Sequence, residues 1–90
     1  MDANDDPFVQ DTRERLSALD RSIFDAVNRR LELVARLRQH KAERGYSFLD
    51  PRREQQMVDD AVAANRGPLS ADGLRRLYAE LLELTKRELP

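Results

Sequence analysis

Apolar residues recur every three or four positions along most of this chain, which is the spacing of one face of an α-helix. The longest such stripe consists of Arg13, Leu16, Asp20, Ile23, Val27, Arg30, Val34, Leu37 and Lys41. No glycine or proline interrupts the segment from Asp11 to Arg44, and Gly45 follows in the position where glycine commonly ends a helix. The pattern therefore predicts one helix over about 11–44. At ~1.5 Å per residue it is roughly 50 Å long.

Two shorter helices are predicted after this one. Asp50 and Pro51 form a start signal, with the aspartate as N-cap and the proline at the first helical position, and the apolar spacing continues to about Asn65. An Arg-Gly-Pro break at 66–68 separates this helix from a third, which Ser70 caps. No stretch alternates with the period of a strand. We expect an all-α fold with one very long first helix and two shorter ones.

The chain has 90 residues, enough for one domain. We expect residues 1–10 to form a flexible N-terminal tail and residues 11–90 to form a single helical domain. A helix of about 50 Å cannot bury its whole apolar face inside so short a chain. The sequence therefore predicts a homodimer in which two copies of the long helix pack antiparallel.

Charge and composition exclude several classes of function. The formal net charge is −1 and there are no cysteines, so we expect no general attraction to nucleic acid or anionic membranes, and no disulfide. No apolar run approaches membrane-spanning length, and the acidic N-terminus lacks a signal-peptide core, which favours a cytoplasmic protein. Glycine-rich phosphate loops, metal-ligand clusters and nucleophile–base pairs are absent from the sequence, so no metal or cofactor is expected.

Three cations lie on the apolar stripe: Arg13, Arg30 and Lys41. An arginine on such a stripe commonly reaches solvent with its head group or pairs with a glutamate across a helix seam. Arg30 is the hardest to explain in this way, because aliphatic residues precede and follow it on the stripe. An unpaired charge held there costs several kcal/mol, so the stripe predicts the wall of an anion-binding pocket.

Distances along the helix decide which cations can share a ligand. Arg30 and Lys41 are roughly 16 Å apart along the axis, within reach of two long side chains, whereas Arg13 and Lys41 are roughly 42 Å apart. An antiparallel partner would bring its own Arg13 alongside, and twofold symmetry would then create two equivalent sites from both chains. Fixed cations around a dianion, without a base or nucleophile, suit a unimolecular rearrangement.

The second and third helices supply further candidates. Arg53 presents a fork suited to a carboxylate, and Asp50 and Glu54 lie beside it at the start of the second helix. Simple helix capping is an equal alternative for Asp50. Thr85 continues the apolar stripe of the third helix, where its hydroxyl either faces the pocket or is satisfied within the core.

These residues together resemble the small all-helical chorismate mutases of the AroQ class. The segments that carry the resemblance are Arg13-Glu14-Arg15-Leu16-Ser17-Ala18-Leu19-Asp20, Asn28-Arg29-Arg30-Leu31-Glu32-Leu33-Val34, Lys41 and Asp50-Pro51-Arg52-Arg53-Glu54. The resemblance implies an intertwined dimer of three-helix chains that converts chorismate to prephenate, a Claisen rearrangement in phenylalanine and tyrosine biosynthesis.

The resemblance also implies roles. Arg13 of the partner chain and Arg30 would hold the substrate carboxylates, and Lys41 would donate to the ether oxygen whose bond breaks. Arg53 would lie by a carboxylate, with Asp50 and Glu54 near the ring hydroxyl. Thr85 falls where the family usually has serine or a similar polar residue. This set agrees with the pocket expected from the stripe, since a preplaced ammonium favours the transition state, in which the ether oxygen gains negative charge.

One position departs from the family pattern. Four residues after the Thr85 position the family commonly has glutamine or glutamate, which also reaches the ether oxygen, but this chain has Leu89 there and Glu88 one residue earlier. Positions three and four residues after Thr85 both lie near one helix face, so a slight rotation or a frayed last turn would bring Glu88 to the ether oxygen, and in that role it must be protonated to donate. If Glu88 points away, Lys41 acts alone, and the enzyme should be weak or suited to a different substrate.

Three alternatives stay open from the sequence. The same scaffold serves 4-amino-4-deoxychorismate mutases, and Asp50 and Glu54 would tolerate an ammonium on the ring. It also serves isochorismate-pyruvate lyases, which rank lower because their loop differs. The chain could instead be a non-catalytic helical dimerisation or regulatory module. A shikimate-pathway synthase is a further possible partner, because weak mutases of some bacteria are activated by docking on it.

Overall fold

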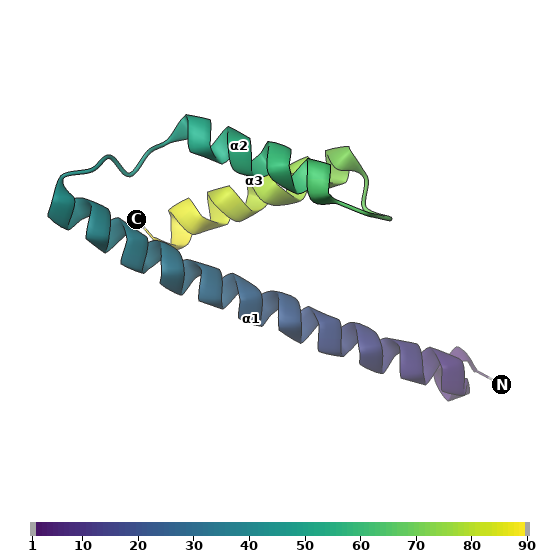
Figure 1. Ribbon diagram of the computed structural model, residues 1–90. Coiled ribbons are helices and arrows are strands. Elements are labelled where there is room, and N and C mark those ends of the chain that lie inside the picture. Colours follow the sequence, from purple (N-terminus) through teal and green to yellow (C-terminus); the bar gives the residue numbers. More distant parts are fainter. Residues whose placement is uncertain (1, 90) are drawn as a thin grey trace. The chain divides into compact units, whose positions relative to one another are not determined.

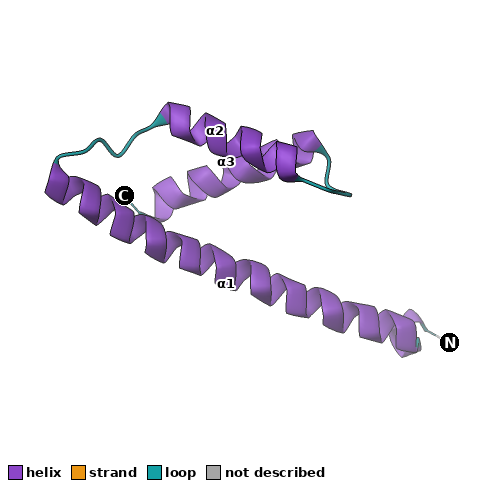
Figure 2. Cartoon of the chain, in the orientation of Figure 1, coloured by secondary structure: helices purple, strands orange, loops and turns teal. Residues whose placement is uncertain are grey.

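The computed structural model describes residues 2–89, and in that range the chain is helical with no strand. A short 3-10 helix, η1 (Ala3–Asp5), precedes three α-helices: α1 (Pro7–Arg44), α2 (Pro51–Ala64) and α3 (Ala71–Glu88) (Figure 1). The loops that separate the α-helices are short (Figure 2). The all-α prediction, with one very long helix and two shorter ones, is confirmed.

The first helix begins earlier than expected. It starts at Pro7 rather than at Asp11, and the Asp6 carboxylate accepts a hydrogen bond from the Phe8 amide at 2.9 Å. Asp6 and Pro7 thus form the same aspartate–proline start signal as Asp50 and Pro51. Whether residues 1–10 are flexible stays an expectation.

The end of α1 is fixed by backbone hydrogen bonds around a left-handed glycine. Gly45 has a φ of 71°, and its amide donates to the Ala42 carbonyl at 3.3 Å. The Tyr46 amide donates to the Lys41 carbonyl at 2.8 Å. These two bonds form a Schellman motif, which ends the helix as the glycine predicted.

The two shorter helices begin where their capping residues predicted. The Asp50 carboxylate accepts from the Arg53 amide at 3.1 Å, and the Ser70 hydroxyl accepts from the Gly73 amide at 2.9 Å. Each bond satisfies an amide that has no partner inside its helix. The C-cap of α2 is Asn65 and that of α3 is Leu89.

The chain forms two compact units, an N-terminal unit (Met1–Leu33) and a C-terminal unit (Val34–Pro90), and α1 runs from one into the other. In the C-terminal unit, α2 and α3 pack against each other. Their half-buried apolar residues include Met57, Val58, Ala61 and Val62 on α2, and Leu74, Tyr78, Leu81 and Leu82 on α3.

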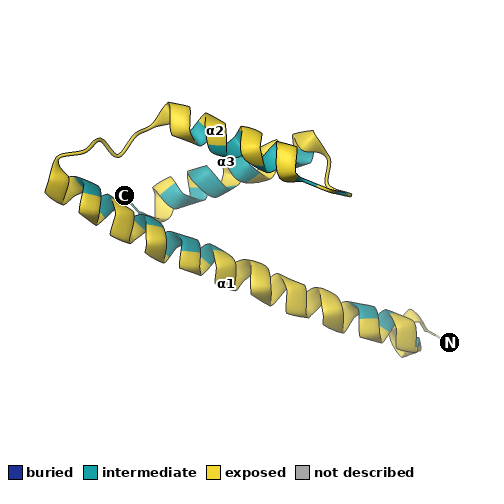
Figure 3. Ribbon diagram, in the orientation of Figure 1, coloured by how far each residue is buried: buried dark blue, intermediate teal, exposed yellow. Residues whose placement is uncertain are grey.

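No residue from 2 to 89 is fully buried in the single chain, and Figure 3 accordingly shows only half-buried and exposed positions. Large apolar side chains of α1 are more than half exposed, among them Leu16, Leu19, Ile23, Phe24 and Leu33. Burying them would stabilise the fold, so one chain leaves much of its apolar surface without a core. None of the described helices is both long enough and apolar enough to pass through a lipid bilayer.

Candidate functional site

The cations predicted to line the pocket differ in exposure. Arg30, in the N-terminal unit, and Lys41, in the C-terminal unit, are half-buried, whereas Arg13 is exposed. The Arg13 guanidinium donates from Nη1 to the side-chain oxygen of Asn4 at 2.6 Å. Within one chain the stripe is therefore not buried, and the burial expected for it requires another surface to cover it.

Lys41 occupies a well-defined turn. Its carbonyl accepts the Tyr46 amide in the Schellman motif at the end of α1, so its backbone is held by the same bonds that terminate the helix. Side chains of residues in the last turn of a helix point back towards its N-terminus. The aliphatic part of the Lys41 side chain can therefore lie along α1 in the direction of its N-terminus, with the ammonium at its end.

The start of α2 gathers three predicted residues within one helical turn. Asp50 and Arg53 are exposed, and Glu54 is half-buried. One Asp50 oxygen accepts the Arg53 amide, and the Asp50 carbonyl accepts the Glu54 amide at 3.0 Å. Asp50 therefore caps α2 through one carboxylate oxygen, and this bond uses the amide of Arg53 and not its guanidinium. The same helix N-terminus favours anions.

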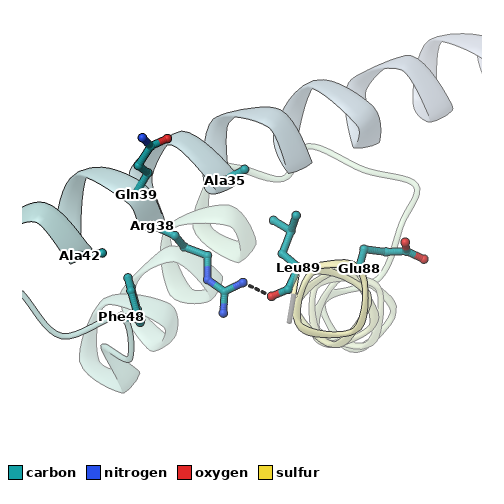
Figure 4. A pocket seen from close by; sticks show the side chains of 7 residues that line it. All are labelled: Ala35, Arg38, Gln39, Ala42, Phe48, Glu88 and Leu89. Atoms are coloured by element: carbon teal, nitrogen blue, oxygen red, sulfur yellow. Dashed lines mark hydrogen bonds between the residues drawn. The ribbon is translucent and has the colours of Figure 1, made fainter.

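The last turn of α3 carries the two remaining predicted residues. Thr85 is half-buried, and its hydroxyl donates to the Leu81 carbonyl at 2.8 Å. Glu88 is exposed, and its carboxylate points away from Arg38 and Leu89 (Figure 4). Glu88 would have to turn to reach a partner on the side of Leu89.

An open hollow of ≈ 550 Å³ lies in the C-terminal unit beside this turn. It is lined by Ala35, Arg38, Gln39, Ala42, Phe48, Glu88 and Leu89 (Figure 4). Glu88 is the one predicted site residue among these seven. The hollow is therefore not the anion pocket expected from the stripe.

Sequence reasoning missed Arg38 and Phe48. The Arg38 guanidinium donates to the carbonyl of Leu89 and lies 5.6 Å from the centre of the Phe48 ring. Spacing along the sequence gives no sign of the first contact, because the acceptor is a backbone oxygen 51 positions away. Among residues 2–89 no group of histidine, cysteine and carboxylate side chains could hold a metal ion.

Two of the three comparisons with known proteins found a match, and both point to the same family. The comparison with curated proteins found no match. Among solved structures the chain is similar to two forms of chorismate mutase from Thermus thermophilus. Form I is 27% identical with a TM-score of 0.83, and the match covers 86% of this chain and 96% of that one. Form II is 26% identical with a TM-score of 0.83, and the match covers 88% and 90%.

The family model described as chorismate mutase type II matches residues 12–88. That range includes every residue predicted for the site, from Arg13 to Glu88, and all three α-helices for most or all of their length. The chain belongs to the chorismate mutase type II family.

Proposed function

We propose that this chain catalyses the rearrangement of chorismate to prephenate at sites that two copies of the chain build together. The observation that carries the proposal is the family match over residues 12–88, because it spans the full set of predicted substrate contacts. The two similar solved structures are chorismate mutases, and the match covers most of their length, which supports the same activity.

The homodimer is part of the proposal. It is supported by the absence of any fully buried residue between positions 2 and 89 and by the exposed apolar face of α1. A second copy of the chain offers a matching apolar face, and an isologous contact would cover both at once. An antiparallel arrangement would also bring Arg13 of one chain towards Lys41 of the other.

Within this site each residue has one task. Arg30, together with Arg13 from the other chain, would bind the carboxylates of the dianion, and Arg53 would contribute from the helix N-terminus. Asp50 and Glu54 would face the ring hydroxyl, and Thr85 would add a hydroxyl. In this arrangement the substrate is held with its reacting carbons close together, which lowers the entropy cost of the rearrangement.

Lys41 would act on the bond that breaks. In the rearrangement the carbon–oxygen ether bond breaks as a new carbon–carbon bond forms, and the ether oxygen gains negative charge in the transition state. A preplaced ammonium stabilises that charge more than it stabilises the substrate, which raises kcat. No proton need be transferred and no covalent intermediate forms. Glu88 is proposed as a second donor to the same oxygen, in its protonated form.

An absorbance assay tests the proposal. Chorismate absorbs in the near ultraviolet and prephenate does not, so a falling signal with purified protein reports turnover. A constant signal would exclude the activity and favour a non-catalytic module. Parallel traces with the 4-amino analogue decide between the two mutase substrates. Adding the shikimate-pathway synthase to the same assay tests it as an activating partner. An unchanged mutase rate would exclude that role.

A further inference from the structure

We infer that Arg38 is a positioning residue for the site proposed above. Its guanidinium joins the end of α1, the loop that leads into α2 and the last turn of α3. The inference rests on the proposed function, since the residues it would position are those proposed to hold the substrate. Arg38 itself is not placed among them.

The first contact of Arg38 is with the end of α3. Arg38 is half-buried, and its Nη1 donates to the carbonyl oxygen of Leu89, the C-cap residue. The last carbonyls of a helix lack partners within the helix and carry partial negative charge, so a guanidinium there is favourable in both respects. The Leu89 amide donates in turn to the Thr85 carbonyl at 2.9 Å. Holding Leu89 therefore holds the turn that carries Thr85.

The second contact of Arg38 is with the loop before α2. The guanidinium carbon lies 5.6 Å from the centre of the Phe48 ring, within the range of a cation–π contact. Phe48 precedes the N-cap Asp50 by two residues, and Asp50 bonds the amide of Arg53. The cation–π contact therefore holds the loop two residues before the N-cap of α2.

Arg38 and its two contact residues, Phe48 and Leu89, all line the hollow described above. Figure 4 shows the Arg38 side chain extending from α1 towards Leu89, with Phe48 on the opposite side of the guanidinium from Leu89. The space beside it is open, with a volume of ≈ 550 Å³, and Phe48 is 48% exposed. Arg38 is therefore oriented by its directional contacts more than by close packing. Arg38 itself and its two contacts lie next to three groups of proposed site residues: Lys41 one turn further along α1, Arg53 and its neighbours on α2, and Thr85 on α3.

The test compares Arg38→Ala with a matched control, Arg36→Ala, which removes an exposed arginine from the same helix. We expect Arg38→Ala to lower kcat for chorismate at least about tenfold, since small misplacements of catalytic groups have effects of this size or larger. KM should change less, about threefold or below, because Arg38 does not touch the substrate. Arg36→Ala should retain both constants.

Amide hydrogen exchange supplies a reading that does not depend on substrate. In Arg38→Ala exchange should accelerate at residues 85–89 and 50–54, while residues 57–62 in the middle of α2 keep their protection. Arg38→Lys keeps a donor for the Leu89 carbonyl and should recover part of kcat and the protection of 85–89. Phe48→Leu should accelerate exchange at 50–54 and leave 85–89 unchanged.

Several outcomes would overturn the inference. They are an unchanged kcat in Arg38→Ala, an equal loss in Arg36→Ala, or faster exchange spread evenly over α2 and α3, which would indicate general destabilisation. If Arg38→Ala fails to fold, Phe48→Leu with wild-type exchange at 50–54 also overturns it. A wild-type chain without mutase activity would refute the proposed function alone, because the exchange pattern is measured without chorismate.

Discussion

The dimer can be tested by placing a charge on the exposed apolar face of α1. Ile23 lies on that face and is 56% exposed in the single chain. Fully burying an isoleucine stabilises by about 1.5–3 kcal/mol, so covering the exposed 56% contributes about 0.8–1.7 kcal/mol per copy. A twofold dimer contains two copies, which together contribute about 1.7–3.4 kcal/mol.

Ile23→Asp removes this contribution and introduces two carboxylates whose desolvation costs several kcal/mol more. The dissociation constant of the dimer should therefore rise by at least about a hundredfold. Sedimentation velocity over a range of protein concentrations measures that constant, and the absorbance assay on the same samples reports whether activity is lost as the dimer dissociates.

Arg21→Glu is the matched control. It also changes a charge on α1, but it lies two residues earlier and so projects about 200° away around the helix. This variant should remain dimeric and active. An Ile23→Asp protein with wild-type dimer affinity, or a wild-type protein that is monomeric and fully active at assay concentrations, would refute the reasoning.

Two further predictions concern the charged residues of the site. Arg30→Ala should lower kcat/KM for chorismate by roughly 10²–10³-fold, or about 3–4 kcal/mol, because a carboxylate of the substrate loses its partner, with helix content by circular dichroism retained. Arg29→Ala, which changes the exposed neighbour, should have little effect, and equal losses in the two variants would contradict the assigned role. If Glu88 donates to the ether oxygen, Glu88→Ala should lower kcat, and Glu88→Gln, which keeps a donor at the same position, should retain or raise it. Equal kcat values in the wild type and both variants would exclude Glu88 and leave Lys41 as the donor.

Local signals in the sequence were sufficient for most of the fold. The caps at Asp50 and Ser70 and the glycine at position 45 act on amides and carbonyls within a few residues, so the residue types alone predict the helix ends. The same logic applied to Asp6 and Pro7 gives the start of α1, whereas the apolar stripe, which begins at Arg13, does not extend that far.

The site is only partly predictable from the sequence, for a physical reason. Helical spacing places Arg30 and Lys41 on one stripe, and the family motif adds Arg53 and Thr85, but spacing does not report contacts between distant segments. The bond from Arg38 to Leu89 is such a contact, since its acceptor is a carbonyl that every residue possesses. The orientation of Glu88 likewise depends on the last turn of α3, where Leu89 already departs from helical geometry.

Mixing two inactive variants tests most directly whether the site is shared between chains. Arg13→Ala and Lys41→Ala should each be nearly inactive. In a mixed dimer of the two, one site carries both defects and the other carries neither. Random exchange makes half of the dimers mixed, so about a quarter of the wild-type sites should be restored.

The matched control mixes Arg30→Ala with Lys41→Ala. In the proposed site, Arg30 and Lys41 come from the same chain. Every mixed dimer then has one defect in each site, and no activity should return. Recovery of about a quarter of the wild-type rate in the first mixture alone is the result we predict. A first mixture that stays at the average of its two parents, or a control mixture that recovers equally, would contradict a site built from Arg13 of one chain and Lys41 of the other.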